Sequence, residues 1–221
     1  MSTTNLIRWS GLIAMLGGIL FPVAAFLHPN GEDLSAVSMP NWVPAHLLGF
    51  VSVTVMHLSL IGLYARQVEQ AGWLGLVGFV LAFVGGAFAI VIQYVTSILI
   101  PLIASQAPAL FDQAMTPPQF APPLFVLGFI LGHVLFGVAT IRAAVLPRGS
   151  GILVISGILL FFLGEVSFLG QGLSAPALQQ VFALIRKLHG IVLLGDIAFG
   201  LGLAWMGYSL WKEKRQFIST G

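Results

Sequence analysis

The chain has 221 residues, of which 58% are hydrophobic and 7% charged, and its formal net charge is +2. Soluble domains carry about 25% charged residues, and a small fold cannot hide this much apolar surface from water, so the composition excludes a soluble protein. The sparse, scattered basic residues give no reason to expect a nucleic-acid partner. Because the chain has no cysteine, disulfides, thiolate metal sites and thiol nucleophiles are also excluded.

Six apolar segments are long enough to cross the hydrocarbon core of a bilayer, which takes about 20 helical residues. They lie at about 7–27, 44–65, 72–100, 123–143, 151–170 and 189–211, and Pro-, Gly- or polar-rich stretches such as 66–72 separate them. Backbone groups in lipid must be hydrogen-bonded within the segment, so these segments are helices. The sequence therefore predicts an all-α fold, a six-helix transmembrane bundle that forms one integral membrane domain over residues 1–221.

The first segment also fits a signal peptide. Arg8 precedes its apolar run, and Val23-Ala24-Ala25 would serve as a cleavage site. An internal repeat favours a retained helix instead.

An offset of 79 residues aligns the third apolar segment with the fifth, without a gap. Gly72, Leu74, Gly78, Leu81, Phe83 and Gly85 then coincide with Gly151, Leu153, Gly157, Leu160, Phe162 and Gly164. The first segment carries a weaker echo at Gly11, Gly17 and Ala24. This pattern predicts three repeated helical hairpins about an axis along the membrane normal. Chance matching among abundant Gly, Leu and Phe is the alternative.

Lys and Arg predict the orientation, because basic residues collect on the cytoplasmic side. With six spans, seven basic residues fall on the side of the termini and two on the other: Arg8, Arg66, Arg142, Arg148, Lys212, Lys214 and Arg215 against Arg186 and Lys187. Both termini are therefore expected in the cytoplasm.

Two acids are the first candidates for chemistry. Glu165 lies about five residues from the outer end of the fifth segment, and Asp196 lies seven residues into the sixth. An acid at mid-span costs about 3 kcal/mol on insertion, so such a residue is a functional candidate by default. We expect an outward-opening polar pocket for a small ligand or substrate, with Glu165 and Asp196 as catalytic candidates. Gln93, His46 and His189, at a similar depth, are the ligand-binding candidates.

Several alternatives remain open at this stage. The two acids also suit a structural role, and a non-catalytic accessory or scaffold subunit of a membrane complex is the second functional class. No histidine pair has the spacing of a zinc motif, so no metal site is predicted. A b-type haem with two histidine ligands is the third reading, using His57 with His133, or His46 with His189. The sequence assigns no cofactor and does not decide whether the protein is an enzyme.

Three stretches carry a resemblance: Trp42-Val43-Pro44-Ala45-His46-Leu47-Leu48-Gly49-Phe50, Gly62-Leu63-Tyr64-Ala65-Arg66 and Gly202-Leu203-Ala204-Trp205-Met206-Gly207-Tyr208. With them the chain resembles uncharacterised small multi-pass membrane proteins of bacteria. The resemblance implies a place in the bacterial inner (plasma) membrane, with the lipid bilayer and other membrane proteins as partners. It implies no activity.

Overall fold

The computed structural model describes residues 3–29, 31, 33–116, 124–169 and 189–218, without the side chains of residues 3–4, 164–169, 189, 191 and 213–218. The predicted all-α class is confirmed, because this part of the chain is 92% helical and contains no strand. Four helical stretches are long and apolar enough to cross a membrane: Asn5–Leu27, Trp42–Gln106, Val126–Ala143 and Val192–Lys212.

The helices follow one another with short connections. The chain begins with α1 (Thr3–Leu27) and the single turn α2 (Leu34–Val37), and continues with α3 (Trp42–Tyr94), the π-helical η1 (Val95–Leu99) and α4 (Ile100–Gln106). A 3₁₀ turn, η2 (Pro108–Leu110), leads into α5 (Phe111–Met115). The second half holds the π-helical η3 (Val126–Leu131), α7 (Gly132–Ala143), α8 (Arg148–Leu169) and α10 (His189–Ile218).

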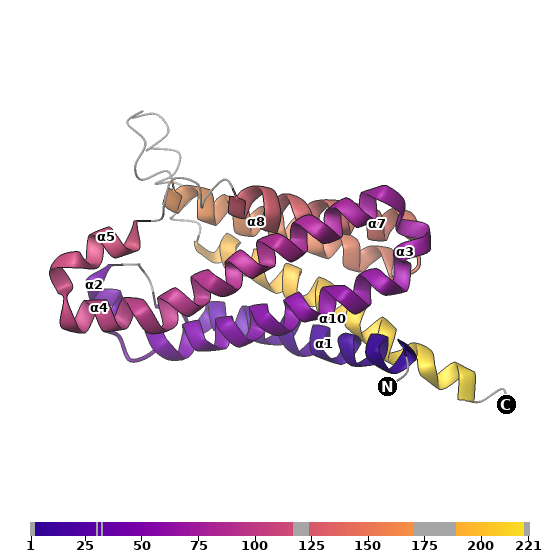
Figure 1. Ribbon diagram of the computed structural model, residues 1–221, viewed down its shortest axis with the longest axis horizontal. Helices are drawn as coiled ribbons and strands as arrows, with labels where there is room; N and C mark the ends of the chain where they lie inside the picture. Colours follow the sequence, from indigo (N-terminus) through magenta and orange to yellow (C-terminus); the bar gives the residue numbers. More distant parts are fainter. Residues whose placement is uncertain (1–2, 30, 32, 117–123, 170–188, 219–221) are drawn as a thin grey trace.

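The long helix α3 folds back on itself at Gly72. This residue has φ 56° and ψ −157°, a conformation that glycine adopts without strain, and it divides α3 into two helical segments. In Figure 1, α3 runs along the bundle, turns, and returns beside its first half. The interruption expected over 66–72 is therefore confined to its last residue. Nothing in the stretch Gln67-Val68-Glu69-Gln70-Ala71 breaks a helix, since it contains neither proline nor glycine.

The bundle has two distinct ends. Both termini, the turn at Gly72 and the α7–α8 connection lie at one end, which we call the terminal end, and α2, α4 and α5 lie at the other, the α2 end (Figure 1). The basic residues Arg8, Arg66, Arg142, Arg148 and Lys212 belong to segments at the terminal end. Asp33 and Asp112 belong to segments at the α2 end.

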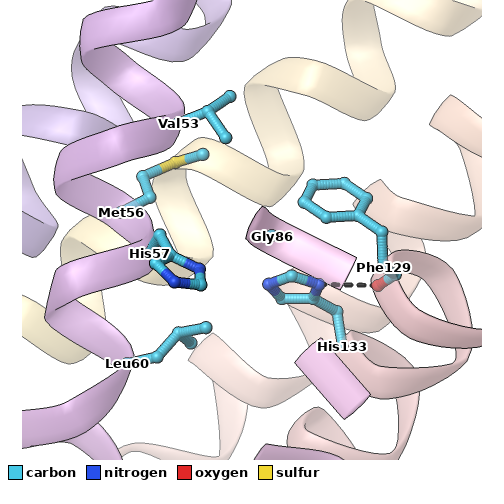
Figure 2. Close-up of a pocket in the computed structure, with 7 residues that line it drawn as sticks. All are labelled: Val53, Met56, His57, Leu60, Gly86, Phe129 and His133. Carbon is cyan, nitrogen blue, oxygen red and sulfur yellow. Dashed lines mark hydrogen bonds between the residues drawn. The ribbon is translucent and has the colours of Figure 1, made fainter. Parts of the chain in front are cut away.

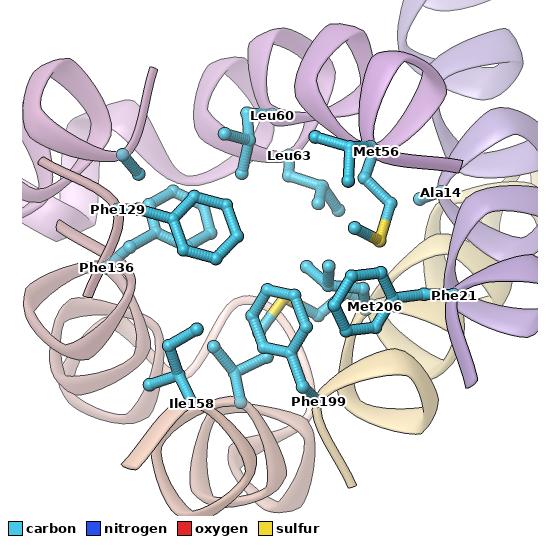
Figure 3. Close-up of a cluster of buried hydrophobic side chains, with 14 of the residues drawn as sticks. Ala14, Phe21, Met56, Leu60, Leu63, Phe129, Phe136, Ile158, Phe199 and Met206 are labelled. Carbon is cyan, nitrogen blue, oxygen red and sulfur yellow. The ribbon is translucent and has the colours of Figure 1, made fainter. Parts of the chain in front are cut away.

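The core lies along the centre of the bundle, and every long helix contributes to it. Figure 3 shows its apolar side chains meeting between the helices: Ala14, Phe21, Met56, Leu60, Leu63, Phe129, Phe136, Ile158, Phe199 and Met206. The outward face is also apolar, with Phe26 75% exposed and Trp73 81% exposed. Large apolar side chains over a whole outer surface are what a lipid environment requires and what water disfavours.

Glycines at helix contacts allow the backbones to approach closely. A Cβ atom built on any of three glycines from the repeat pattern would press on the helical segment that follows it: Gly17 on Met56, Gly78 on Phe136, and Gly157 on Phe199. The glycines Gly18 and Gly200 bring α1 against α10 in the same way. Small residues of this kind supply the van der Waals contact that holds helices together in lipid.

Candidate functional site

The candidate site begins with a buried tryptophan at the start of α3. Trp42 is 0% exposed, and its indole Nε1–H donates a hydrogen bond of 2.9 Å to the backbone carbonyl of Thr96 in η1. In a π-helical turn the carbonyl of residue i accepts the N–H of residue i+5, as Val95 does from Ile100. For Thr96 that donor would be residue 101, which is a proline and has no N–H. The indole therefore supplies the donor that the helix lacks.

Trp42 in turn holds two histidines. The ring of His46, one turn along α3, lies against the indole with centroids 4.2 Å apart, and the ring of His28 lies 5.4 Å from it. His28 follows the end of α1, and the Asn41 side chain fixes this end by donating a 2.7 Å hydrogen bond to the carbonyl of Leu27. That carbonyl belongs to the last turn of α1 and has no partner within its own helix. The cross-link brings the end of α1 to the start of α3.

The two imidazole rings face each other through their Nε2 atoms, which are 3.2 Å apart. The other ring nitrogen of each is committed: Nδ1 of His28 lies 2.7 Å from the carbonyl oxygen of Pro29, and Nδ1 of His46 lies 3.0 Å from that of Trp42. A carbonyl oxygen only accepts, so both Nδ1 atoms carry a hydrogen, and two neutral rings would then point lone pairs at each other. A proton shared by the two Nε2 atoms, or a metal ion bound to both of them, removes this conflict.

Gln93 lies one turn further into the bundle, on the returning half of α3. Its side-chain amide packs against Gly49, where a Cβ atom would lie 2.8 Å from Oε1. Among the described residues this Oε1 is buried and has no hydrogen-bond partner. Leaving a buried acceptor unsatisfied costs about 1–3 kcal/mol. Packing alone therefore gives no reason for a glutamine at this position.

Asp196 is buried inside the bundle, with 4% of its surface exposed. It lies on α10 between Gly195, which packs against Phe161 of α8, and Phe199 one turn later. The ring of Phe199 contacts those of Phe21, Phe129 and His133 in the bundle centre. Residues three apart share a helix face, so Asp196 lies on this inner face, one turn nearer the α2 end than Phe199.

A second histidine pair lies at the level of Phe199. His57 and His133 line the same small cavity, together with Val53, Met56, Leu60, Gly86 and Phe129 (Figure 2). Nδ1 of His133 donates a 2.7 Å hydrogen bond to the carbonyl of Phe129, which leaves Nε2 facing His57. The His57 ring stacks on Phe83 with centroids 4.0 Å apart. The cavity has room for about one water molecule.

The predicted site residues are therefore only partly brought together. Gln93 and His46 lie in the α2-end half, as does Asp196 by its position on α10, and His46 contacts His28. Glu165 belongs to α8 and His189 begins α10, but both side chains lie outside the described part of the chain. A meeting of Glu165 with Asp196 therefore stays a prediction. Within the described residues no three His, Asp or Glu side chains gather as a metal cluster.

Neither of the two histidine pairs in the described part of the chain fits a haem, and the alternative that pairs His46 with His189 stays a prediction because the His189 side chain is not described. A macrocycle has to lie between two axial histidines, and Nε2 atoms 3.2 Å apart in His28 and His46 leave no room for one. The space between His57 and His133 holds about one water molecule, far less than a porphyrin needs.

The sequence analysis did not identify three residues that make hydrogen bonds between helices: Trp42, Asn41 and Gln67. Trp42 stands at the start of an apolar segment, where tryptophans commonly mark a membrane interface, but it is fully buried and bonds the carbonyl of Thr96. Asn41 belongs to no sequence motif that would predict its hydrogen bond to Leu27. Gln67, which falls in the expected interruption, is fully buried and donates a 3.1 Å hydrogen bond to the hydroxyl of Thr140. The proline five residues after Thr96 indicates that the Thr96 carbonyl lacks a helical hydrogen-bond donor, but nothing in the sequence shows which residue replaces that donor.

Comparison with family models, with characterised proteins and with solved structures finds no match for this chain. The resemblance to small bacterial multi-pass proteins therefore stays a prediction.

Proposed function

We infer that the chain crosses a membrane six times, as three helical hairpins with both termini in the cytoplasm. The turn at Gly72 and the 22-residue length of α8 supply the two crossings beyond the four apolar stretches. The matching contacts of Gly17, Gly78 and Gly157 with the segment that follows each support the repeat. The basic residues at the terminal end support the orientation, and a bacterial inner membrane is the expected location.

The function that the geometry supports best is binding of a small polar ligand at the α2 end, which is then the outer end. The observation that carries it is the His28–His46 pair, whose two Nε2 atoms converge at 3.2 Å while their Nδ1 atoms are held by carbonyls. Gln93 and Asp196 continue the polar groups inward from this pair. Binding is the proposal, and a reaction on the bound ligand would call on the acids Asp196 and Glu165.

An accessory subunit without chemistry is the second candidate, and the unsatisfied Gln93 Oε1 separates the two. If Gln93 serves a ligand, its replacement by methionine removes a buried acceptor without a partner and fills the same space. We then expect Gln93→Met to raise the free energy of unfolding by about 1 kcal/mol. If the glutamine instead holds helices together, the variant unfolds more easily.

The measurement is thermal and denaturant unfolding of the purified protein in detergent. Binding predicts that Gln93→Met does not lower the midpoint, because residues that serve a ligand commonly reduce stability. A fall of the midpoint would support the accessory role. Ser105→Ala is the control, because among the described residues its exposed hydroxyl bonds only the Leu102 carbonyl of its own helix.

A further inference from the structure

The side-chain nitrogens of His28 and His46 indicate the class of ligand that this site would bind. Each ring donates its Nδ1–H to a backbone carbonyl, at 2.7 Å for His28 and 3.0 Å for His46. Histidines that bind metals almost always make such a bond with the second nitrogen, because it fixes the tautomer and the ring orientation. The pair therefore already has the outer contacts of two metal ligands.

The separation of the two Nε2 atoms also suits a shared metal ion. With metal–nitrogen bonds of about 2.0–2.1 Å, two ligands at a tetrahedral angle have nitrogens about 3.3 Å apart, and two at a right angle about 2.9 Å apart. The observed distance of 3.2 Å lies between these values. His46 is 6% exposed whereas His28 is half-buried, so one ligand is anchored in the bundle and the other borders its surface.

We propose that His28 and His46 bind a divalent transition-metal ion of the Zn²⁺ type through their two Nε2 atoms, at the outer end of the bundle. The inference rests on the proposed ligand site and gives that site a ligand class. Imidazole nitrogen is a preferred ligand of zinc, copper and nickel, whereas Mg²⁺ and Ca²⁺ prefer oxygen.

Zn²⁺ binding uses the lone pairs of both Nε2 atoms. A proton that the two Nε2 atoms share in the metal-free protein would leave to solvent when the ion binds, and each Nε2 lone pair would then form a bond to the ion. Trp42 packs against both rings and holds them in either state, with ring centroids at 4.2 Å and 5.4 Å.

The test is isothermal titration calorimetry of tag-free protein with ZnCl₂, repeated in two buffers with different heats of protonation. We expect saturable binding of about one ion with release of about one proton. His28→Phe and His46→Phe should each abolish this binding, and His57→Phe should leave it intact. Mg²⁺ should give no heat of binding to the unaltered protein.

Three results would overturn the proposal: no saturable Zn²⁺ binding, binding that survives both His28→Phe and His46→Phe, or equal binding of Mg²⁺. Should the two phenylalanine variants fail to fold, His28→Gln removes one imidazole but keeps a polar side chain, and it must also lose the ion. If Zn²⁺ does not bind but Gln93→Met raises the stability of the protein, the metal proposal is wrong and the proposed ligand site is still supported. If Zn²⁺ does not bind and Gln93→Met lowers the stability, the accessory role is supported instead.

Discussion

The indole of Trp42 donates a 2.9 Å hydrogen bond to the backbone carbonyl of Thr96, 54 residues away along the chain. This bond joins the beginning of α3 to the π-helical turn η1 that follows its end. It exists because Pro101 removes the N–H that the π-helical turn would have used. The same tryptophan forms one wall of the histidine pair, so a proline on one segment orients a candidate site on another.

We expect Trp42→Phe to lower the free energy of unfolding by about 1–3 kcal/mol through the orphaned Thr96 carbonyl alone. In a Pro101→Ala background, residue 101 offers its own N–H, so the same substitution should cost less. A double-mutant cycle measures this coupling by denaturant unfolding in mixed micelles. Additive effects of Trp42→Phe and Pro101→Ala would show that the indole does not replace the missing N–H.

Gly85 tests how closely the returning half of α3 approaches η3. A Cβ atom here would overlap the backbone of Gly128 and Phe129, which cannot give way as a flexible side chain does. We expect Gly85→Ala to destabilise the protein by about 1–3 kcal/mol, the usual range for an overpacked contact.

Gly190 is the matched control for this substitution. It lies in α10, and no atom of the described residues comes within 4 Å of a Cβ added there. Gly190→Ala should stabilise the protein by about 0.5–1 kcal/mol, because alanine is the better helix former. Thermal unfolding of both variants in one detergent gives the comparison, and equal effects would contradict the close approach.

Asp33 gives a pH dependence at the α2 end. It caps α2, and the hydroxyl of Ser35 at 2.6 Å and the backbone N–H of Ala36 at 2.9 Å lower the pKa of its carboxyl below 3.8. Because the folded-state pKa is the lower one, the cap stabilises α2 above the unfolded pKa and is lost as pH falls through the folded value.

The measurement for Asp33 is hydrogen exchange at the Ala36 amide, expressed relative to the intrinsic rate at each pH. Protection should decline as the pH falls below the ordinary range of aspartate. In Asp33→Asn the side chain still accepts from Ala36 but does not ionise, so protection should not change with pH. An identical decline in both proteins would assign the effect to another group.

The sequence predicted the helical class and placed the long helices well, because twenty apolar residues in a row leave little choice of structure in lipid. The interruption that it predicted over 66–72 contains the turn at Gly72 but is too long, since the polar character of Arg66 and Glu69 suggests a loop although both residues favour helix. Hydropathy indicates where a chain leaves the membrane, whereas the helix itself ends only at Gly72, whose positive φ reverses the chain direction.

The candidate site was harder to predict. The sequence identified His46, Gln93 and Asp196 as polar groups in apolar helices, and depth along a helix placed them in one half of the bundle. It did not predict the contact of His46 with His28, and its pairing of His46 with His189 stays a prediction because the His189 side chain lies outside the described part of the chain. The contact of His46 with His28 depends on the hydrogen bond from the Asn41 side chain to the Leu27 carbonyl. The periodicity of apolar residues gives no information on individual hydrogen bonds between helices.

The central claim is that Nε2 of His28 lies against Nε2 of His46 while the Nδ1 atoms of both rings donate to backbone carbonyls. Nuclear magnetic resonance of protein labelled with ¹⁵N-histidine, in lipid nanodiscs, tests it directly through scalar coupling across an N–H···N hydrogen bond. The structure predicts one coupled pair of Nε2 signals with both Nδ1 atoms protonated, lost in His28→Phe and replaced by metal-bound signals on addition of Zn²⁺. Uncoupled Nε2 signals in the metal-free protein, or an Nδ1 of either ring without its hydrogen, would contradict the account.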